Sequence, residues 1–262
     1  MSIRSLLAVA LAAGLAFATA TARADLAQWD QAKVTALACR APIAGFVYRR
    51  ASLQRRPRVK LHNGIGPNPR VVRIFLAEKG LDVPLVPVDL LGGENRREPY
   101  LSKNPAGQLP CLELDDGRFL SEITAICEYL EEKKPEPALV GRTPEERAVT
   151  RMWVRRLDLN IIEPLANGFR YAEGLPIFRD RIHVIPQAAA DLKAIAREKL
   201  AWLDGQLCGP WIVGDRFTLA DVLLFAFLEF GAQVGQKLDE KLLALADWYG
   251  RVEARESVAK SR

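Results

Sequence analysis

The stretch NPAGQLPCLELDDGRFLSEITAICEYLEE, Asn104–Glu132, decides the fold. It contains two short runs typical of β-strands, Cys111–Leu114 and Arg118–Leu120, on either side of Asp116-Gly117. Asp-Gly between alternating apolar residues predicts a hairpin with a type I′ turn, because that turn needs positive φ at both central residues. Pro110 opens the first run, the position where a missing N–H costs the ladder least.

A helix is predicted to follow the hairpin directly. Ile123, Ile126, Cys127 and Leu130 recur at helical spacing and form one apolar stripe. Ser121 is a suitable N-cap. The start of a helix presents unpaired N–H groups and the positive end of its dipole. We therefore expect a position for a small anion where the hairpin meets this helix.

The residues before this stretch predict a strand, a helix and a second strand. Val59-Lys60-Leu61 is a short strand, and His62–Pro69 is a turn rich in Gly, Pro and Asn. A helix then begins with Pro69 near its first position and ends at Gly80, before a second strand at Val83–Leu91. Strand–helix–strand, then hairpin and helix, is the order of the thioredoxin-type fold and implies a parallel strand pair.

The residues after this stretch predict only helices. Lys133–Gly141 is a linker with two prolines. Thr143–Glu146 has the pattern of a capping box and starts a helix that runs to about Ala166, with a kink expected at Pro164.

Three further features complete the helical half. A second helix runs from near Pro186 to Gly209, with inward side chains at helical spacing: Leu192, Ile195, Leu200, Leu203 and Leu207. Thr218 and Asp221 form another capping box, assigned to stability, and a last helix spans about Leu238–Ala254.

The first 24 residues read as a secretory leader. Arg4 gives the positive start, Ser5–Ala18 the apolar run, and Ala22-Arg23-Ala24 the cleavage pattern. The apolar run is too short to span a membrane as a helix. With a working leader, the mature protein would begin at Asp25 and be exported to the periplasm or beyond.

We expect instead that translation begins near Val59 and that the protein is cytoplasmic, with export as the alternative. Residues 25–57 show no clear element, and Arg49–Lys60 resembles an unstructured basic linker. The first 60 residues hold 10 Lys/Arg against 2 Asp/Glu, whereas the remainder holds 27 against 30. The main body is therefore mildly acidic, which argues against nucleic acid as its partner.

The four cysteines predict no metal site and no dithiol. Cys39, Cys111, Cys127 and Cys208 show neither C-x-x-C nor paired zinc-ligand spacing. Cys111 lies in a predicted strand and Cys127 on an apolar helical stripe, so both are expected to be buried free thiols.

Taken together, NPAGQLP and DGRFLSEITAICEYL resemble the glutathione-binding half of a bacterial, cytosolic-type glutathione S-transferase. The resemblance implies an α/β plus all-α fold: a thioredoxin-like domain at residues 58–133, then an all-helical glutathione S-transferase domain at 143–262. It also implies glutathione as co-substrate, a small electrophilic or disulfide second substrate, a homodimer and a role in detoxification. No metal, nucleic acid or membrane is expected.

The resemblance implies a set of glutathione-binding residues. Leu109-Pro110 is expected to be a cis peptide, with the Leu109 backbone paired to the cysteinyl backbone of glutathione. Gln108 corresponds to a Lys/Gln position at the tripeptide's carboxylate end, unless it is only an exposed turn residue. Glu122 matches the acid that pairs with the γ-glutamyl amine, unless it only complements the helix dipole. Ile123 replaces the usual Ser and offers its backbone N–H to the γ-glutamyl carboxylate.

The thiol-activating position departs from the family. Transferases of this type use a Tyr, Ser or Cys between the first strand and first helix, but His62–Arg70 contains no hydroxyl and no thiol. The usual Ser falls on Gly66 and the usual Tyr near His62, which we expect to be a neutral turn residue. Pro67-Asn68 is similar to the Pro-Asn of Nu-class transferases, whose asparagine amide serves the thiol. Asn68, expected just before the helix, is thus the candidate catalytic residue, unless it only caps the helix.

The expected activity is conjugation of the glutathione thiol to small electrophiles. The acceptor pocket is expected between the domains, on helix faces around four residues: Trp153, Arg156, Asn160 and Tyr171. A glutathione-dependent disulfide reductase is an alternative that the Pro-Asn resemblance favours. A non-catalytic protein of the same fold that binds ligands or partners is another, consistent with the missing hydroxyl.

Overall fold

A computed structural model describes residues 59–262 of the chain. The expected leader, the expected linker at 25–57 and Cys39 lie outside the described residues, so those assignments stay predictions. None of the helices in the described part is long and apolar enough to cross a membrane.

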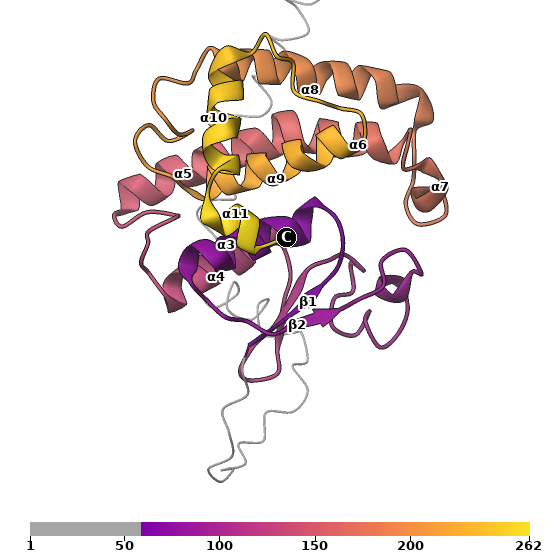
Figure 1. Cartoon of the computed structure of the whole chain (residues 1–262). Helices are drawn as coiled ribbons and strands as arrows, with labels where there is room; N and C mark the ends of the chain where they lie inside the picture. The colour runs from indigo at the N-terminus through magenta and orange to yellow at the C-terminus, as the bar shows by residue number, and fades with distance from the viewer. Residues whose placement is uncertain (1–58) are drawn as a thin grey trace, which may run out of the picture. The chain divides into compact units, whose positions relative to one another are not determined.

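The first part of the described chain is a small α/β unit. Its elements are β1 (Lys60–Asn63), α3 (Pro67–Lys79), β2 (Leu85–Pro87), the 3₁₀ turn η2 (Glu94–Arg96), β3 (Cys111–Glu113), β4 (Phe119–Leu120) and α4 (Ile123–Lys133). In Figure 1, α3 and α4 lie between the strands and the C-terminal helices. The second predicted strand is shorter than expected, because only three of its residues pair with β1.

The strands form one mixed sheet in the order β2-β1-β3-β4. β1 pairs in parallel with β2, with Leu61 opposite Leu85, and antiparallel with β3, with Leu61 opposite Leu112. The parallel pair is joined through α3, as the strand–helix–strand pattern predicted. The thioredoxin-like arrangement expected from the sequence is confirmed.

The hairpin between β3 and β4 forms, but the type I′ turn was wrong. Leu114 N donates to Arg118 O at 2.8 Å, and Gly117 N donates to Leu114 O at 3.0 Å. Gly117 has φ 82°, whereas Asp116 does not have positive φ, since Glu122 is the only such non-glycine residue in 59–262. These bonds define a three-residue loop that needs a single left-handed residue, the other common hairpin solution.

The second part is entirely helical. Its elements are α5 (Pro144–Leu157), the π-turn η3 (Asp158–Ile162), α6 (Glu163–Arg170), α7 (Leu175–Phe178), η4 (Pro186–Ala188), α8 (Ala189–Asp204), α9 (Leu219–Gln233), α10 (Leu243–Glu253) and α11 (Glu256–Lys260). The single long helix predicted through Ala166 is therefore divided. Pro164 lies near the start of α6 and has no N–H to continue the α5 pattern, so the chain passes through a π-turn first.

Two predictions about the last helices were wrong. Ile195 is 41% exposed, and Ala196 occupies the buried face of α8 in its place. The helix predicted at about Leu238–Ala254 is α10, which begins at Leu243 because Asp239 forms a turn in which its carboxylate accepts from Lys241 N at 3.0 Å. It is not the last helix, since α11 follows it.

The predicted capping box at the start of α9 is confirmed. Asp221 is fully buried, and its carboxylate accepts from the backbone N of Thr218 and Ile212 at 2.8 and 2.9 Å. It also accepts from Trp248 Nε1 on α10 at 2.8 Å. Burial raises the pKa of Asp221, and these donors oppose that rise. Asp221 thus joins three segments inside the helical core, which agrees with a role in stability.

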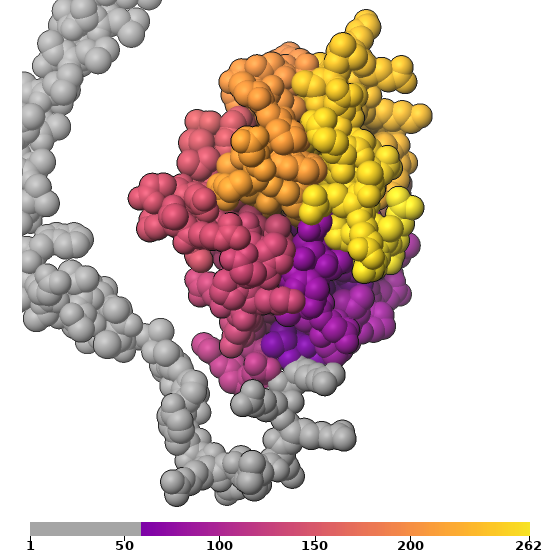
Figure 2. All heavy atoms as spheres, turned by 60° about the vertical axis from the view of Figure 1, so that its left-hand side comes forward, coloured from indigo at the N-terminus to yellow at the C-terminus, as the bar shows by residue number. Residues whose placement is uncertain are grey.

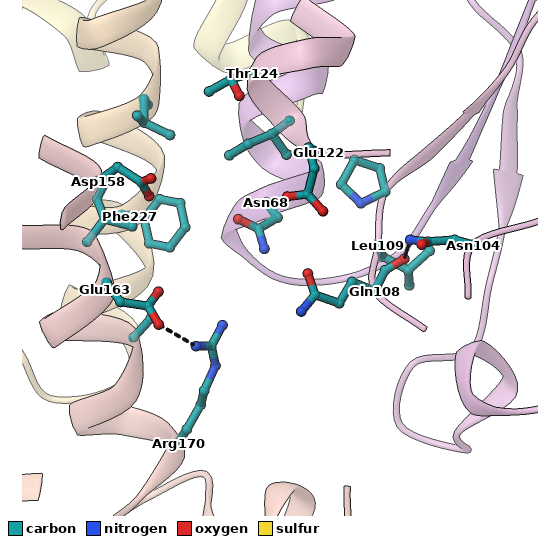
Figure 3. A pocket seen from close by; sticks show the side chains of 15 residues that line it. Asn68, Asn104, Gln108, Leu109, Glu122, Thr124, Asp158, Glu163, Arg170 and Phe227 are labelled. Atoms are coloured by element: carbon teal, nitrogen blue, oxygen red, sulfur yellow. Dashed lines mark hydrogen bonds and ion pairs between the residues drawn. The ribbon is translucent and has the colours of Figure 1, made fainter. Parts of the chain in front are cut away.

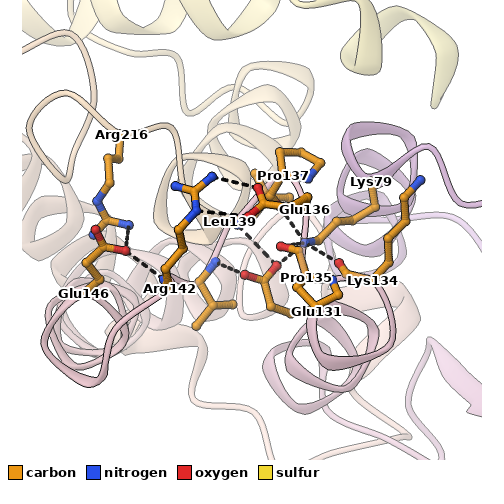
Figure 4. Close-up of polar contacts among 11 residues, drawn as sticks. Lys79, Glu131, Lys134, Pro135, Glu136, Pro137, Leu139, Arg142, Glu146 and Arg216 are labelled. Carbon is orange, nitrogen blue, oxygen red and sulfur yellow. Dashed lines mark hydrogen bonds and ion pairs between the residues drawn. The ribbon is translucent and has the colours of Figure 1, made fainter.

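A buried ion pair fixes the segment that connects the two parts (Figure 4). Lys79 at the end of α3 pairs with Glu131 of α4, and both are almost completely buried. Lys79 Nζ also donates to three backbone carbonyls of the connecting segment: Lys134 at 2.8 Å, Pro135 at 3.1 Å and Pro137 at 2.6 Å. The Glu131 carboxylate accepts from the backbone N of Leu139 and Val140. We call this set of contacts the linker junction.

The C-terminal residues hold α3 from the other side. Figure 2 shows them, in yellow, against the purple α/β part. Arg70 of α3 is buried and donates to Glu229 of α9 at 2.7 Å and to Ser261 Oγ at 2.7 Å. The orientation of α3, and with it the position of the Asn68 backbone, is therefore set by the helical part.

Candidate active site

A pocket of about 210 Å³ lies between the α/β part and the helices. Side chains predicted for glutathione binding and catalysis all line it: Asn68, Gln108, Leu109, Pro110, Glu122 and Ile123. These six come from the start of α3, from the loop before β3 and from the start of α4. Figure 3 shows Asn68 near the centre, with Glu122 and Gln108 to its right and Asp158 and Phe227 to its left.

Asn68 lies inside the first turn of α3, not before it. The helix begins at Pro67 rather than Pro69, and its N-cap is Gly66, so the alternative that Asn68 caps the helix is also wrong. Pro67 and Pro69 have no N–H, and Arg70 N donates to Gly66 O at 3.3 Å. Among the residues that begin α3, Asn68 alone offers an unpaired backbone N–H. It therefore presents two donors, backbone and side-chain amide, at the positive end of α3.

The loop before β3 holds its backbone open toward the pocket. Leu109-Pro110 is a cis peptide, as predicted. The carbonyl of Gln108 accepts from Tyr100 Oη at 2.6 Å and from Asn104 Nδ2 at 2.8 Å, which anchors the loop. Leu109 is only 5% exposed, yet its backbone N–H and C=O have no hydrogen-bond partner within residues 59–262. Buried backbone groups are normally paired, so this edge is suited to a peptide ligand.

The start of α4 combines strain with unpaired donors. The predicted Ser121 cap was wrong, because the N-cap is Glu122 and no side chain of the described chain caps the helix. Glu122 has φ 67° and ψ 118°, a strained conformation for a residue with a Cβ, of the kind that clusters at functional sites. The first helical bond is donated by Ile126 N to Glu122 O, so the N–H groups of Ile123 and Thr124 point out of the helix start unpaired by described residues.

The helical side of the pocket was missed by the sequence analysis. Asp158, Glu163, Arg170 and Phe227 line it from η3, α6 and α9 (Figure 3). Burial raises the pKa of Asp158, and Arg155 opposes that rise. Arg170 lies 3.8 Å from Glu163. Of these four, Glu163 and Arg170 follow the π-turn, which rotates their side chains by about 100° relative to a continuous helix. Pro164 predicts a kink at this point, but it does not indicate this rotation, and it bears on neither Asp158 nor Phe227.

A second, more apolar pocket of about 350 Å³ adjoins the first and shares Asn68, Gln108 and Arg170 with it. Its walls include aromatic residues of α6, α7 and α9: Phe169, Phe178, Phe227 and Phe230. A pocket thus lies between the parts, where the acceptor was expected, but the residues predicted to line it were wrong. Trp153, Arg156, Asn160 and Tyr171 do not line either pocket. Trp153 instead faces Trp202 of α8, with ring centroids 6.1 Å apart.

No thiol or phenol lines either pocket. Cys111 and Cys127 are buried free thiols, as predicted, and burial raises the pKa of Cys111 to about 11. Cys208 is exposed. No group of three or more His, Cys, Asp or Glu side chains suited to a metal ion occurs in the part of the chain that the structure describes.

His62 was expected in the turn, but it lies in β1 and is 3% exposed. Its Nε2 is 3.2 Å from Glu113 Oε2. Burial lowers the pKa of His62, and Glu113 partly opposes this. A neutral imidazole agrees with the prediction, although its place in the fold does not.

Comparison with known proteins gives consistent results. Residues 65–133 match the family described as "Glutathione S-transferase, N-terminal domain", and residues 174–256 match "Glutathione S-transferase, C-terminal domain". Glutathione S-transferase 2 of Saccharomyces cerevisiae is 36% identical over 202 residues, which cover 74% of this chain and 85% of that protein. Maleylacetoacetate isomerase of Pseudomonas aeruginosa is 40% identical over 172 residues, covering 64% and 78%.

A solved structure shows the same fold. The glutathione S-transferase domain-containing protein from Marinobacter aquaeolei VT8 superimposes with a TM-score of 0.72 at 37% identity. The match covers 76% of this chain and 99% of that chain.

Proposed function

This chain belongs to the glutathione S-transferase family, and we propose that it conjugates the glutathione thiol to small electrophiles. The observation that carries the proposal is the pocket in which an unpaired peptide edge, an acid at a strained helix start and a doubly donating asparagine meet. The adjoining apolar pocket gives the electrophile a place beside the sulfur.

In this proposal the polarity of the pocket orients the tripeptide. The γ-glutamyl ammonium pairs with Glu122, and Asp158 adds a second carboxylate from the opposite wall. The γ-glutamyl carboxylate accepts from the N–H groups of Ile123 and Thr124 at the start of α4. The cysteinyl backbone pairs with the N–H and C=O of Leu109, and the glycyl carboxylate extends toward Gln108.

Asn68 lowers the pKa of the glutathione thiol in this arrangement. An ordinary thiol has a pKa near ~8.5, so only a few per cent is thiolate at neutral pH. The Asn68 amide and backbone N–H both stabilise the thiolate, and the α3 dipole adds to them. Activation of this kind is worth about 1 kcal/mol, because a less basic thiolate is also a poorer nucleophile. Most of the rate gain then comes from holding the sulfur against the acceptor.

A second candidate is a glutathione-dependent disulfide reductase. The observation that favours it is the lack of any Cys, Ser or Tyr among the residues that line the two pockets. An enzyme thiol then takes no part, and bound glutathione thiolate attacks a mixed disulfide directly, releasing the other thiolate.

The test begins with binding. We expect calorimetric titration with glutathione and S-hexylglutathione to show heat for the wild type. Glu122→Gln should weaken both, and Glu132→Gln, at an exposed position near the end of the same helix, should bind as the wild type does. No heat with either ligand would overturn the proposal.

Turnover then separates the activities. Conjugation of 1-chloro-2,4-dinitrobenzene supports the transferase, and reduction of hydroxyethyl disulfide alone supports the reductase. Binding without either turnover supports the non-catalytic alternative. The homodimer and the role in detoxification belong to the proposal as well, and light scattering on the purified protein checks the first.

A further inference from the structure

The apolar pocket carries an excess of positive charge. Arg96, Arg170 and Arg181 line it, whereas no Asp or Glu is among its lining residues. Arg170 Nη1 lies 3.8 Å from Glu163 Oε1, and Glu163 lines the first pocket but not this one. Neither Arg96 nor Arg181 forms an ion pair with any carboxylate of the described chain. Two guanidinium groups thus face an apolar space without a counter-ion.

Arg181 is held in a fixed position beside this space. Its Nη1 donates to Leu90 O at 2.8 Å and its Nη2 to Leu91 O at 2.9 Å. Carbonyl groups fix the direction of the guanidinium but do not neutralise its charge. Three of its five N–H donors remain for a ligand.

Arg96 approaches the same space from η2. Its Nε is buried and has no hydrogen-bond partner within residues 59–262, and its Nη1 makes only a long contact of 3.4 Å to Ala106 O. Burial and the charge of Arg181 both lower the pKa of Arg96, so the two cations lie close enough to repel each other. Like charges left together in this way favour an anion between them.

Glutathione alone does not balance these charges. If it binds as proposed above, its γ-glutamyl carboxylate lies at the start of α4, and only the glycyl carboxylate reaches this side. One carboxylate neutralises only part of the positive charge of the three arginines, even with Glu163 beside Arg170. The remaining occupant of the pocket is the acceptor, whose body must also suit aromatic walls: Phe169 lies edge-to-face with Phe230 at 4.9 Å and with Phe178 at 6.1 Å.

We infer that the acceptor is an apolar, aromatic electrophile that carries a carboxylate, and that Arg181 together with Arg96 binds this carboxylate. The inference rests on the proposed function and names its substrate class. With an aryl chloride as acceptor, the thiolate sulfur forms a bond to the ring carbon that bears chlorine. The carbon–chlorine bond then breaks, chloride leaves with the bonding electron pair, and the thiol proton goes to solvent.

The test compares two acceptors of the same shape, 4-chloro-3,5-dinitrobenzoate and 4-chloro-3,5-dinitrobenzamide. Each kcat/KM is divided by the rate constant of the uncatalysed reaction of that compound with glutathione, which removes the difference in intrinsic reactivity. We expect the wild type to prefer the carboxylate by about tenfold or more, and the preference to fall as salt is added.

Variants assign the preference to residues. Arg181→Gln should raise KM for the carboxylate far more than KM for the amide, and should thereby abolish the preference. Arg179→Gln is the matched control, since Arg179 is exposed, lies two residues away and lines neither pocket. The Arg179→Gln variant should prefer the carboxylate acceptor over the amide by the same factor as the wild type.

Each other result counts against the inference. A wild type that conjugates both acceptors equally overturns it and leaves the proposed function standing. If Arg96→Gln raises only KM for glutathione and Arg181→Gln keeps the preference, the anion of this site is the glycyl carboxylate, and the inference is wrong. A protein that binds glutathione but turns over neither acceptor loses both this inference and the conjugating function.

Discussion

The linker junction and the pocket proposed to bind glutathione differ in how they use polar groups. At the junction, Lys79 and Glu131 are buried, and each makes several hydrogen bonds to the backbone of the connecting segment. In the pocket, the side chains of Asn68, Gln108 and Glu122 have no hydrogen-bond partner within the described chain. The polar groups of the junction stabilise the fold, whereas those of the pocket remain free to bind a ligand.

The two arrangements carry different energetic consequences. A buried charge that loses its partner keeps its full desolvation penalty, so single substitutions at the junction should be severe. Polar groups that face solvent lose little when they are removed. Substitutions in the pocket should therefore change binding or rate without a loss of stability.

The largest expected effect is at the junction. Lys79→Met should lower the free energy of unfolding by about 3–5 kcal/mol, because it leaves Glu131 charged and buried without a cation. Urea denaturation followed by circular dichroism measures this. Lys133→Met, at an exposed position on the last turn of α4, should change stability by less than about 0.5 kcal/mol.

The double variant Lys79→Met/Glu131→Leu sharpens this point. Replacing both charges with apolar groups should recover part of the loss, since no unpaired charge remains. If the double variant is as unstable as the sum of the two single variants, the junction does not act as an ion pair.

At Glu122, one substitution is expected to change ligand affinity and protein stability in opposite directions. Glu122→Gly should lower glutathione affinity about tenfold or more, since it removes the partner of the γ-glutamyl ammonium. It should also raise the free energy of unfolding by about 1 kcal/mol, because glycine adopts positive φ without strain. Calorimetry and urea denaturation of the same preparation give both numbers.

Glu122→Ala is the matched control for this pair of effects. It removes the same carboxylate but keeps a Cβ in the strained conformation. Affinity should fall as in the glycine variant, whereas stability should not rise. Equal stability of the two variants would mean that the φ of 67° stores no strain.

The same contrast explains how much could be predicted from the sequence. The hairpin, the parallel strand pair and the buried box at Thr218 and Asp221 follow from local patterns, because spacing and turn residues act within a few positions. The lining of the apolar pocket could not be predicted, because it depends on the π-turn that precedes Pro164 and on how α7 and α9 pack beside α6. Asn68 was identified by resemblance, but its place inside α3 depends on a helix start two residues earlier than Pro69.

The linker junction was also invisible in the sequence. Lys79 and Glu131 lie 52 positions apart and read as ordinary charged residues at the ends of helices. Only the packing of α3 against α4 brings them together beside the connecting segment. Long-range pairing of this kind has no local signal.

A smaller effect is expected at Asn68. Asn68→Ala should lower kcat about tenfold and raise the pKa of bound glutathione by about one unit, since one of two donors to the thiolate is lost. Thiolate absorbance near 240 nm as a function of pH reports that pKa directly. Asn68→Asp should lower the rate further, because a carboxylate repels the thiolate. An unchanged rate and an unchanged pKa in Asn68→Ala would show that the amide does not serve the sulfur.

The smallest expected effect is the pH dependence contributed by His62. Burial lowers its pKa below 6.5 in the folded state, although Glu113 opposes this and Lys103 and Lys60 add to it. The unfolded chain therefore binds the proton more readily, so His62 makes the free energy of unfolding fall as pH decreases through and below about 6.5, by no more than about 1.4 kcal/mol per pH unit. His62→Gln should flatten the curve between pH 7 and about 5, measured by urea denaturation at each pH. The only other histidine, His183, is exposed, and His183→Gln should leave the curve unchanged. If the wild type instead becomes more stable relative to His62→Gln as pH falls, the ion pair with Glu113 outweighs burial. His62 would then act as a paired charge, as Lys79 and Glu131 do at the linker junction.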